Sequence, residues 1–487
     1  MLRAARPAGA TSPRASLGRV APPRQTPTLG KQHRRHGLAV RTAAIIGGGF
    51  SGTLLALHLL GAGPHMRVAL LERDKGFGRG LAFSTGNPSH LLNVPAGRMS
   101  AYSGDPGHFL RWLQAEDPAT EAGSFVPRRL FGAYVRQLLH DELKHAGDRL
   151  DLLRADVHSL DAGADGITLH AAGRRIAADV AVLATGNFPP APPPVADPAF
   201  YDSPLYRPDP WAPDALAGLH PQAPVLLIGT GLTAVDTVVS LLDQGHEGPI
   251  HALSRRGLLP QRHVAGVVPE PAGELPRTLA PLARAVRARA KAAMAAGRPW
   301  HGAVDGLRPV STTLWQGFSP GDRERFLRHL RPWWDVHRHR MAPAVADRIE
   351  AARLSGQLRI HAGRIGRYVA GAEGVPHGVE VCFRTRGTCA PASLRAARVV
   401  NCSGPGADFA RATDPLLQSL LASGTARPDP LRLGLDVSPS CAVRNARGVD
   451  TPGLYAAGPL TKAAFWESTA VPDIRVQCEQ LAERLAS

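Results

Sequence analysis

The sequence predicts an α/β fold, because the same local pattern of an apolar strand, a glycine-rich turn and a helix occurs twice. The two strands are the apolar runs 43–46 and 225–228. The turn residues that we expect to face a ligand are Gly47, Gly49, Ser51 and Gly52 in the first copy, and Gly229 and Gly231 in the second. Glycines permit the tight turn and let the backbone approach a pyrophosphate, whose charge then lies at a helix N-terminus. The pattern therefore predicts two Rossmann-like dinucleotide-binding domains.

The residue that follows the next strand indicates which cofactor the first site binds. Two dinucleotide sites in one chain indicate a flavin and a nicotinamide. The apolar run 68–71 ends in Glu72, at the spacing where dinucleotide-binding proteins place an acid. A carboxylate there accepts hydrogen bonds from an adenosine ribose and repels a 2′-phosphate. We therefore assign FAD to the first site and include Glu72 and its neighbour Arg73 in it.

The second site has different residues after the corresponding strand. After the strand 250–253 come Ser254, Arg255 and Arg256, with no carboxylate. A hydroxyl and two guanidinium groups suit a 2′-phosphate, for which the donor fork of arginine is well shaped. The prediction for this site is NADPH, with NADH as the alternative, because both arginines can also simply face solvent.

Composition excludes several classes of protein. The chain has 487 residues, 44% of them hydrophobic and 20% charged, which is typical of a soluble protein of two or three domains. No apolar run reaches the length of about 18 residues that a membrane helix needs. The net charge of +17 does not indicate nucleic-acid binding, because no basic stripe interleaved with aromatic residues accompanies it.

Much of the positive charge lies in residues 1–41, which contain no Asp or Glu. We expect a disordered basic arm there, although the composition also resembles an organellar transit peptide, and an incorrectly assigned start codon is a third possibility. The five cysteines form no Cys-x-x-Cys pair. This spacing disfavours a disulfide reductase, is consistent with a cytoplasmic protein and predicts no metal site.

The domain order follows from further strand ends. A strand at 180–183 runs into Thr185 and Gly186, where chains of this kind leave the FAD domain, and the proline-rich stretch after it is typical of a linker. A similar strand end at 399–404 predicts that the chain returns to the FAD domain there. We divide the chain into the arm 1–41, a first FAD part 42–215, an NAD(P) domain with a helical insertion 216–365, and a second FAD part 366–487. Helices are expected over 280–295 and 320–353.

Several longer motifs stand out, at 78–84, 90–95, 98–100, 126–134, 334–340 and 471–475. Together they resemble a family of bacterial FAD/NAD(P)-binding oxidoreductases, and the resemblance covers about residues 42–487. The layout is more distantly similar to N-hydroxylating and Baeyer–Villiger flavin monooxygenases. Some bacterial flavin-dependent urate hydroxylases look like members of the same family.

The resemblance implies flavin contacts at Asn93 and Met99, and a further contact at the late turn that ends in Gly458. In many related flavoproteins an Asp after this turn binds the ribityl chain, but here Pro459 stands in its place. Either backbone amides around Gly458 replace that carboxylate, or the local geometry differs. His90, inside one of the motifs, is either a general base or a structural histidine.

The predicted function is an FAD-dependent NAD(P)H oxidoreductase, with a monooxygenase favoured. Because no redox-active cysteine pair is present, dioxygen is the favoured electron acceptor. The substrate suggested by the resemblance is a small planar anion, urate, which would be converted to 5-hydroxyisourate. The alternatives are an amine N-hydroxylase, a diaphorase without oxygen insertion, and a non-catalytic nucleotide-sensing flavoprotein. The sequence leaves the oligomeric state open.

The candidate substrate residues are His337, Arg338, His339 and Trp466. Arginine and histidine suit an oxygen-rich anion through charge-assisted hydrogen bonds, and tryptophan offers a stacking face. The alternative interpretation of the first three is a solvated basic helix face, and that of Trp466 is a core residue.

Overall fold

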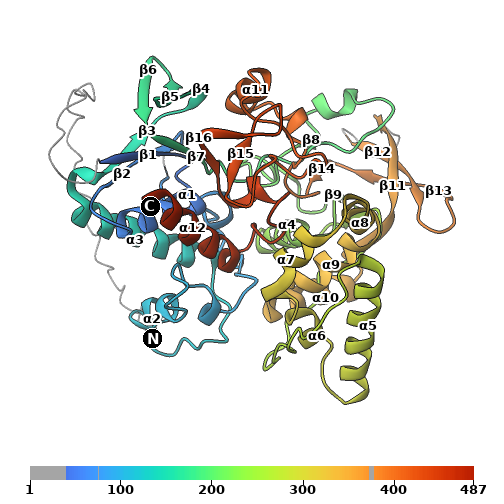
Figure 1. The fold of residues 1–487 in the computed structure, drawn as a ribbon. Helices are drawn as coiled ribbons and strands as arrows, with labels where there is room; N and C mark the ends of the chain where they lie inside the picture. Colours follow the sequence, from blue (N-terminus) through green and yellow to red (C-terminus); the bar gives the residue numbers. More distant parts are fainter. Residues whose placement is uncertain (1–39, 75, 372–377) are drawn as a thin grey trace, which may run out of the picture. The chain divides into compact units, whose positions relative to one another are not determined.

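The first glycine turn belongs to a six-stranded sheet (Figure 1). The computed structural model describes residues 40–487 except 75 and 372–377, so nearly all of the predicted arm 1–41 lies outside the described residues. The strands, in their order across the sheet, are β15 (Ala442–Arg444), β16 (Asp450–Ala456), β7 (Val180–Leu183), β1 (Arg41–Ile46), β2 (Met66–Glu72) and β3 (Leu150–Arg154). Strands from both ends of the chain thus share one sheet, and the predicted discontinuity of the first domain is confirmed.

Both faces of this sheet are covered, which explains why its central strands consist of apolar residues without alternation. One face packs against α1 (Phe50–Gly61), α3 (Arg128–Ala146) and α12 (Val471–Ala486). The other face packs against α11 (Pro415–Ala422) and a small antiparallel sheet. The small sheet consists of β4 (Val157–Gly163), β5 (Gly166–Ala171) and β6 (Arg174–Ala178). The short helix α2 (His108–Gln114) contributes Phe109 and Leu113 to the core beside α3.

The second glycine turn belongs to a seven-stranded sheet. Its strands, in order, are β13 (Pro391–Ala396), β12 (Val379–Thr385), β11 (Leu358–Ala370), β10 (Ile250–Ser254), β9 (Val225–Ile228), β14 (Arg398–Asn401) and β8 (Tyr206–Arg207). The helices α4 (Leu232–Asp243) and α10 (Pro343–Leu354) share a core with β9 and β10. The α/β class with two Rossmann-like units is therefore confirmed.

Strands from both sides of the predicted boundaries 216 and 365 belong to the second sheet. Strand β8 joins the second sheet before residue 216, and β12, β13 and β14 join it after residue 365. The reason is that β12 and β13 extend β11 as an antiparallel meander, while β14 pairs in parallel with β9. The second sheet therefore continues to Asn401, which agrees with the strand end predicted at 399–404.

A group of helices separates β10 from β11. They are α5 (Leu279–Ala295), α6 (His301–Asp305), α7 (Ser311–Gly317), α8 (Pro320–Arg325), a π-helical turn (Phe326–Leu330) and α9 (Arg331–Arg338). The prediction of helix over 280–295 is confirmed. That over 320–353 is interrupted at 339–342, where the chain leaves helical conformation before α10. Within the described residues, no helix is both long and apolar enough to cross a membrane.

Candidate functional site

The first glycine turn is built so closely that larger side chains do not fit. Gly47 has φ of 111°, and a Cβ on it would lie 2.4 Å from the carbonyl oxygen of Ala184 at the end of β7. A Cβ on Gly52 would lie 1.9 Å from the carbonyl oxygen of Gly47. Helix α1 therefore begins directly against the turn, with Gly49 at its N-cap and Ser51 buried in its first turn. This is the geometry that a pyrophosphate requires.

Glu72 lies beside this turn, as the sequence predicts. Its Oε2 accepts a hydrogen bond of 2.8 Å from the amide of Gly48, and its Oε1 accepts one of 3.1 Å from the amide of Asp74. Each carboxylate oxygen has a further lone pair that can accept from a ribose hydroxyl. Arg73 forms an ion pair of 3.2 Å with Asp414, at the start of α11. Its guanidinium is thus held by another element of the same domain.

The other predicted FAD residues lie near this turn or on the segments around it. Thr185 follows β7, and its buried hydroxyl has no hydrogen-bond partner among the described residues, which fits a site for a bound polar group. Gly186 follows with φ of 76°. Met99 is buried in the core shared with α1, and Asn93 is half-buried. Together with the glycine turn, these features fit FAD.

The late turn, where Pro459 stands in place of the Asp of related flavoproteins, is closely packed. Gly458 has φ of 72°, and a Cβ on it would lie 2.4 Å from the hydroxyl oxygen of Ser51. Its amide donates a hydrogen bond of 2.8 Å to Oε1 of Gln477 on α12. The amide of Gly458 is therefore engaged within the protein. Sequence reasoning missed Gln477, because no motif links this helix position to the turn.

The second glycine turn repeats the construction of the first. Gly229 has φ of 112°, and a Cβ on it would lie 2.5 Å from the carbonyl oxygen of Cys402, just after β14. Gly231 is the N-cap of α4, and a Cβ there would meet nothing within 4 Å. The turn therefore packs tightly against the sheet on one side and leaves open space on the other.

The three residues predicted to recognise a 2′-phosphate face different ways. The hydroxyl of Ser254 accepts a hydrogen bond of 2.9 Å from the amide of Gly257 and thereby holds the turn after β10. Arg256 donates long hydrogen bonds, of 3.4 and 3.5 Å, to carbonyl oxygens of the π-helical turn. Arg255 is exposed. Of the two guanidinium groups, that of Arg255 is the more accessible to a ligand.

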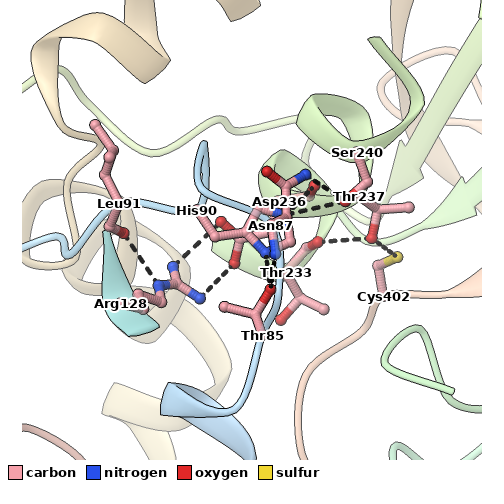
Figure 2. A network of polar contacts seen from close by, with 10 residues as sticks. All are labelled: Thr85, Asn87, His90, Leu91, Arg128, Thr233, Asp236, Thr237, Ser240 and Cys402. Carbon is pink, nitrogen blue, oxygen red and sulfur yellow. Dashed lines mark hydrogen bonds and ion pairs between the residues drawn. The ribbon is translucent and has the colours of Figure 1, made fainter. Parts of the chain in front are cut away.

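The two dinucleotide units are joined by a network of polar contacts (Figure 2). Arg128, at the start of α3, forms two hydrogen bonds to the carboxylate of Asp236 on α4, of 2.7 and 3.2 Å. Both side chains are largely buried. The third donor, Nε of Arg128, reaches the carbonyl oxygen of Leu91 at 3.0 Å. The pair thus connects the first domain to the helix that begins at the second glycine turn.

His90 belongs to the same network, and its hydrogen bonds show a structural role. Its Nε2 donates to the carbonyl oxygen of Asp236 at 3.0 Å and lies 2.9 Å from the hydroxyl of Ser240. Its Nδ1 lies 2.8 Å from the hydroxyl of Thr85. Burial lowers the pKa of His90, so the ring is neutral and both nitrogens are used. On α4, Thr237 extends the network to Sγ of Cys402 at 3.4 Å.

The structure does not bring the basic residues 337–340 together as one anion-binding group. The guanidinium of Arg340 is buried in an ion pair with Asp305. That of Arg338 lies 3.3 Å from the buried carboxylate of Glu467. Burial, together with the charge of Arg338, lowers the pKa of His339 to about 4. His337 donates a hydrogen bond of 2.7 Å to the carbonyl oxygen of Trp333 and borders an apolar cavity.

Trp466 is a buried residue on the wall of the apolar cavity. Its ring packs against Trp315, with 4.7 Å between ring centres. Nζ of Lys462 lies 4.8 Å from the ring centre of Trp466. Lys462 lines a small polar cleft together with Gly186, Ser403 and other residues that follow β7 and β14. The cleft thus lies where both chain exits meet. Sequence reasoning missed Lys462, which no motif contains.

Comparisons with known proteins agree with this architecture. Residues 44–188 match a family described as FAD-NAD(P)-binding, so this part of the chain is an FAD-NAD(P)-binding domain. No curated protein sequence matches the chain.

Among solved structures, the chain is similar to the ornithine hydroxylase of Pseudomonas aeruginosa, with a TM-score of 0.61 and 17% identity over 92% of this chain and 99% of that one. It is also similar to the ornithine N-hydroxylase of Kutzneria sp. 744, with a TM-score of 0.60 and 14% identity over 92% and 99% of the two chains. A third is the cadaverine monooxygenase of Erwinia amylovora, with a TM-score of 0.60 and 12% identity over 92% and 94%. At these identities the comparisons show a shared fold.

The substitution Gly52→Ala should abolish FAD binding, because its Cβ would lie 1.9 Å from a backbone oxygen of the turn. The control is Gly61→Ala at the other end of α1, where a Cβ meets nothing within 4 Å. The ratio of flavin to protein absorbance in the purified variants measures the difference. Full flavin content in Gly52→Ala would show that the cofactor does not lie on this turn.

Removing either partner of the Arg128–Asp236 pair should destabilise the protein by about 3 kcal/mol, because it leaves a buried charge without its counterion. The variants are Arg128→Ala, Asp236→Ala and the double variant, compared by urea unfolding. The double variant should be less destabilised than the sum of the single variants. Additive effects would mean that the two side chains do not stabilise each other.

Proposed function

We propose that the protein is an FAD-dependent monooxygenase that oxidises NADPH and uses dioxygen to hydroxylate a small anionic molecule. The observation that supports this most is the pair of similarly built glycine turns. Gly47 lies against the carbonyl of Ala184, and Gly229 lies against that of Cys402. The Arg128–Asp236 pair holds the helix of the second turn against the first domain.

The residues of the first domain would hold FAD in extended form. The amides at the start of α1 would donate to the pyrophosphate, and Glu72 would accept from the adenosine ribose. The unpartnered hydroxyl of Thr185 would contact the part of the cofactor nearest the end of β7. The chemistry that bound FAD supplies is the transfer of two electrons from a nicotinamide to dioxygen.

The state of the cysteines favours dioxygen over a disulfide as the electron acceptor. All five cysteines are free. Burial raises the pKa of Cys402 to about 12 and that of Cys441 to about 11, and it also raises the pKa of Cys478. These three groups are therefore neutral thiols, which react poorly in disulfide exchange. Cys382 and Cys389 belong to β12 and the turn after it, at the edge of the second sheet.

The polar cleft between the chain exits is the proposed position of the substrate. Arg331 and Lys462 line it, and among its described lining residues there is no Asp or Glu. Two cations on the wall favour an anion over an amine, and one of them, Arg331, also pairs with the carboxylate of Asp335 at 3.4 Å. Urate, the substrate suggested by family resemblance, is such an anion. Amine N-hydroxylation is the second candidate, because the similar solved structures are described as ornithine and cadaverine hydroxylases.

Purified protein should oxidise NADPH and take up oxygen when urate is added, with loss of urate absorbance. Lys462→Met should raise the KM for urate about tenfold, because it removes one charge-assisted hydrogen bond. Lys144→Met, which changes an exposed lysine on α3, is the matched control. A panel of urate, aromatic acids and diamines, followed by an oxygen electrode, makes the comparison.

Three outcomes would contradict the proposal. Stimulation by diamines alone would assign the protein to amine N-hydroxylation. NADPH oxidation that a dye supports equally well under nitrogen would indicate a diaphorase. Bound flavin without any turnover would favour the nucleotide-sensing alternative.

NADPH should be preferred over NADH. Arg255→Ala should raise the KM for NADPH about tenfold and leave the KM for NADH nearly unchanged, because this exposed guanidinium would contact only the 2′-phosphate. Arg395→Ala, an exposed arginine on β13 of the same sheet, is the control. Equal effects on both cofactors, or a preference for NADH in the unmodified protein, would overturn the assignment.

A further inference from the structure

The helices between β10 and β11 enclose a cavity that neither dinucleotide site uses. Its volume is about 450 Å³, which lies within the range of small-molecule sites. Helices α5, α6, α7 and α9 and the π-helical turn contribute its walls, and Trp466 from the second part of the FAD domain closes one side. None of its described lining residues also lines the polar cleft. The cavity is therefore a separate site.

The interior of the cavity is apolar and rich in aromatic rings. Of the seven tryptophans in the chain, five line it: Trp300, Trp315, Trp333, Trp334 and Trp466. Aliphatic side chains such as Leu282, Val286 and Leu314 complete the wall. Two large apolar side chains stay unusually accessible, Met294 at 61% and Trp333 at 44%. Apolar surface left open to water in this way is typical of a binding site for an apolar ligand.

The charges on the cavity wall have one sign. Arg287 and Lys291 are exposed and lie one helical turn apart on α5. Among the described lining residues there is no Asp or Glu. An amine would therefore find no counterion here, whereas a carboxylate would find two cations at i and i+4.

We propose that this cavity binds an apolar carboxylic acid. The hydrocarbon part lies against the tryptophan rings, and the carboxylate lies between Arg287 and Lys291. Burial of the hydrocarbon supplies most of the affinity, since apolar transfer is favourable by about 25 cal/mol per Å². The two cations select the acid over a neutral or cationic molecule of the same shape. The proposal is independent of the flavin chemistry, because binding requires neither NADPH nor turnover.

The fluorescence of the five tryptophans on the cavity wall should report directly on ligand binding. Dodecanoate is titrated into the full-length protein with its flavin bound, and tryptophan emission is recorded. A saturable change with a single site is expected. Dodecylamine, which has the same hydrocarbon chain with the opposite charge, should bind at least about tenfold more weakly than dodecanoate. The double substitution Arg287→Ala with Lys291→Ala should weaken dodecanoate about tenfold and leave dodecanol unchanged.

Two variants distinguish specific binding in the cavity from adsorption to the protein surface. Ala283→Trp fills the cavity from α5 and should abolish the change, while flavin absorbance verifies that the protein is folded. Arg284→Ala, an exposed position on the same helix that does not line the cavity, is the control. A non-saturable response, equal binding of dodecylamine, or an unchanged response in Ala283→Trp would overturn the proposal. So would a response that depends on protein concentration, which would indicate contact between two copies of the chain.

Discussion

The buried ion pair between Arg128 and Asp236 is a central contact between the two dinucleotide-binding units. A buried pair of this kind is stable only if its remaining hydrogen-bonding groups are also satisfied. Here the carbonyl of Leu91 accepts from Arg128, and the carbonyl of Asp236 accepts from His90. Because α4 begins at the second glycine turn and carries Asp236, the position of the nicotinamide unit depends on this contact.

The elements that the sequence predicts well are those with a local physical cause. A glycine that must adopt positive φ against a strand end leaves a clear pattern, and Gly47 and Gly229 are both found as expected. Continuous apolar strands follow from burial on both faces. The second sheet continues past the predicted boundary at residue 365, because β12 pairs with β11 and β13 pairs with β12. The sequence alone does not distinguish which of the two sheets such a hairpin joins.

The direction in which a side chain points is a second property that could not be predicted from the sequence. The basic run 337–340 alternates along the chain, but its members turn to partners far away in sequence, Asp305 for one arginine and Glu467 for another. The same holds at the late turn, where the partner of Gly458 is Gln477 on the next helix. Residue type at a motif therefore predicts which chemistry is available, whereas long-range packing decides which groups can use it.

The cleft and the cavity are two different environments, and the ring of Trp466 lines the cavity while it lies near Lys462 of the cleft. In the cleft, burial and the nearby charge of Arg331 lower the pKa of Lys462 to about 8. An anion bound beside this ammonium would favour its charged form and raise that pKa again. Anion binding in the cleft is therefore linked to uptake of a proton above pH 8, and becomes weaker as the solution is made more alkaline. In the cavity, the cations Arg287 and Lys291 lie at exposed positions of α5, where water solvates them. Binding of an acid in the cavity should thus depend on apolar burial far more than on pH.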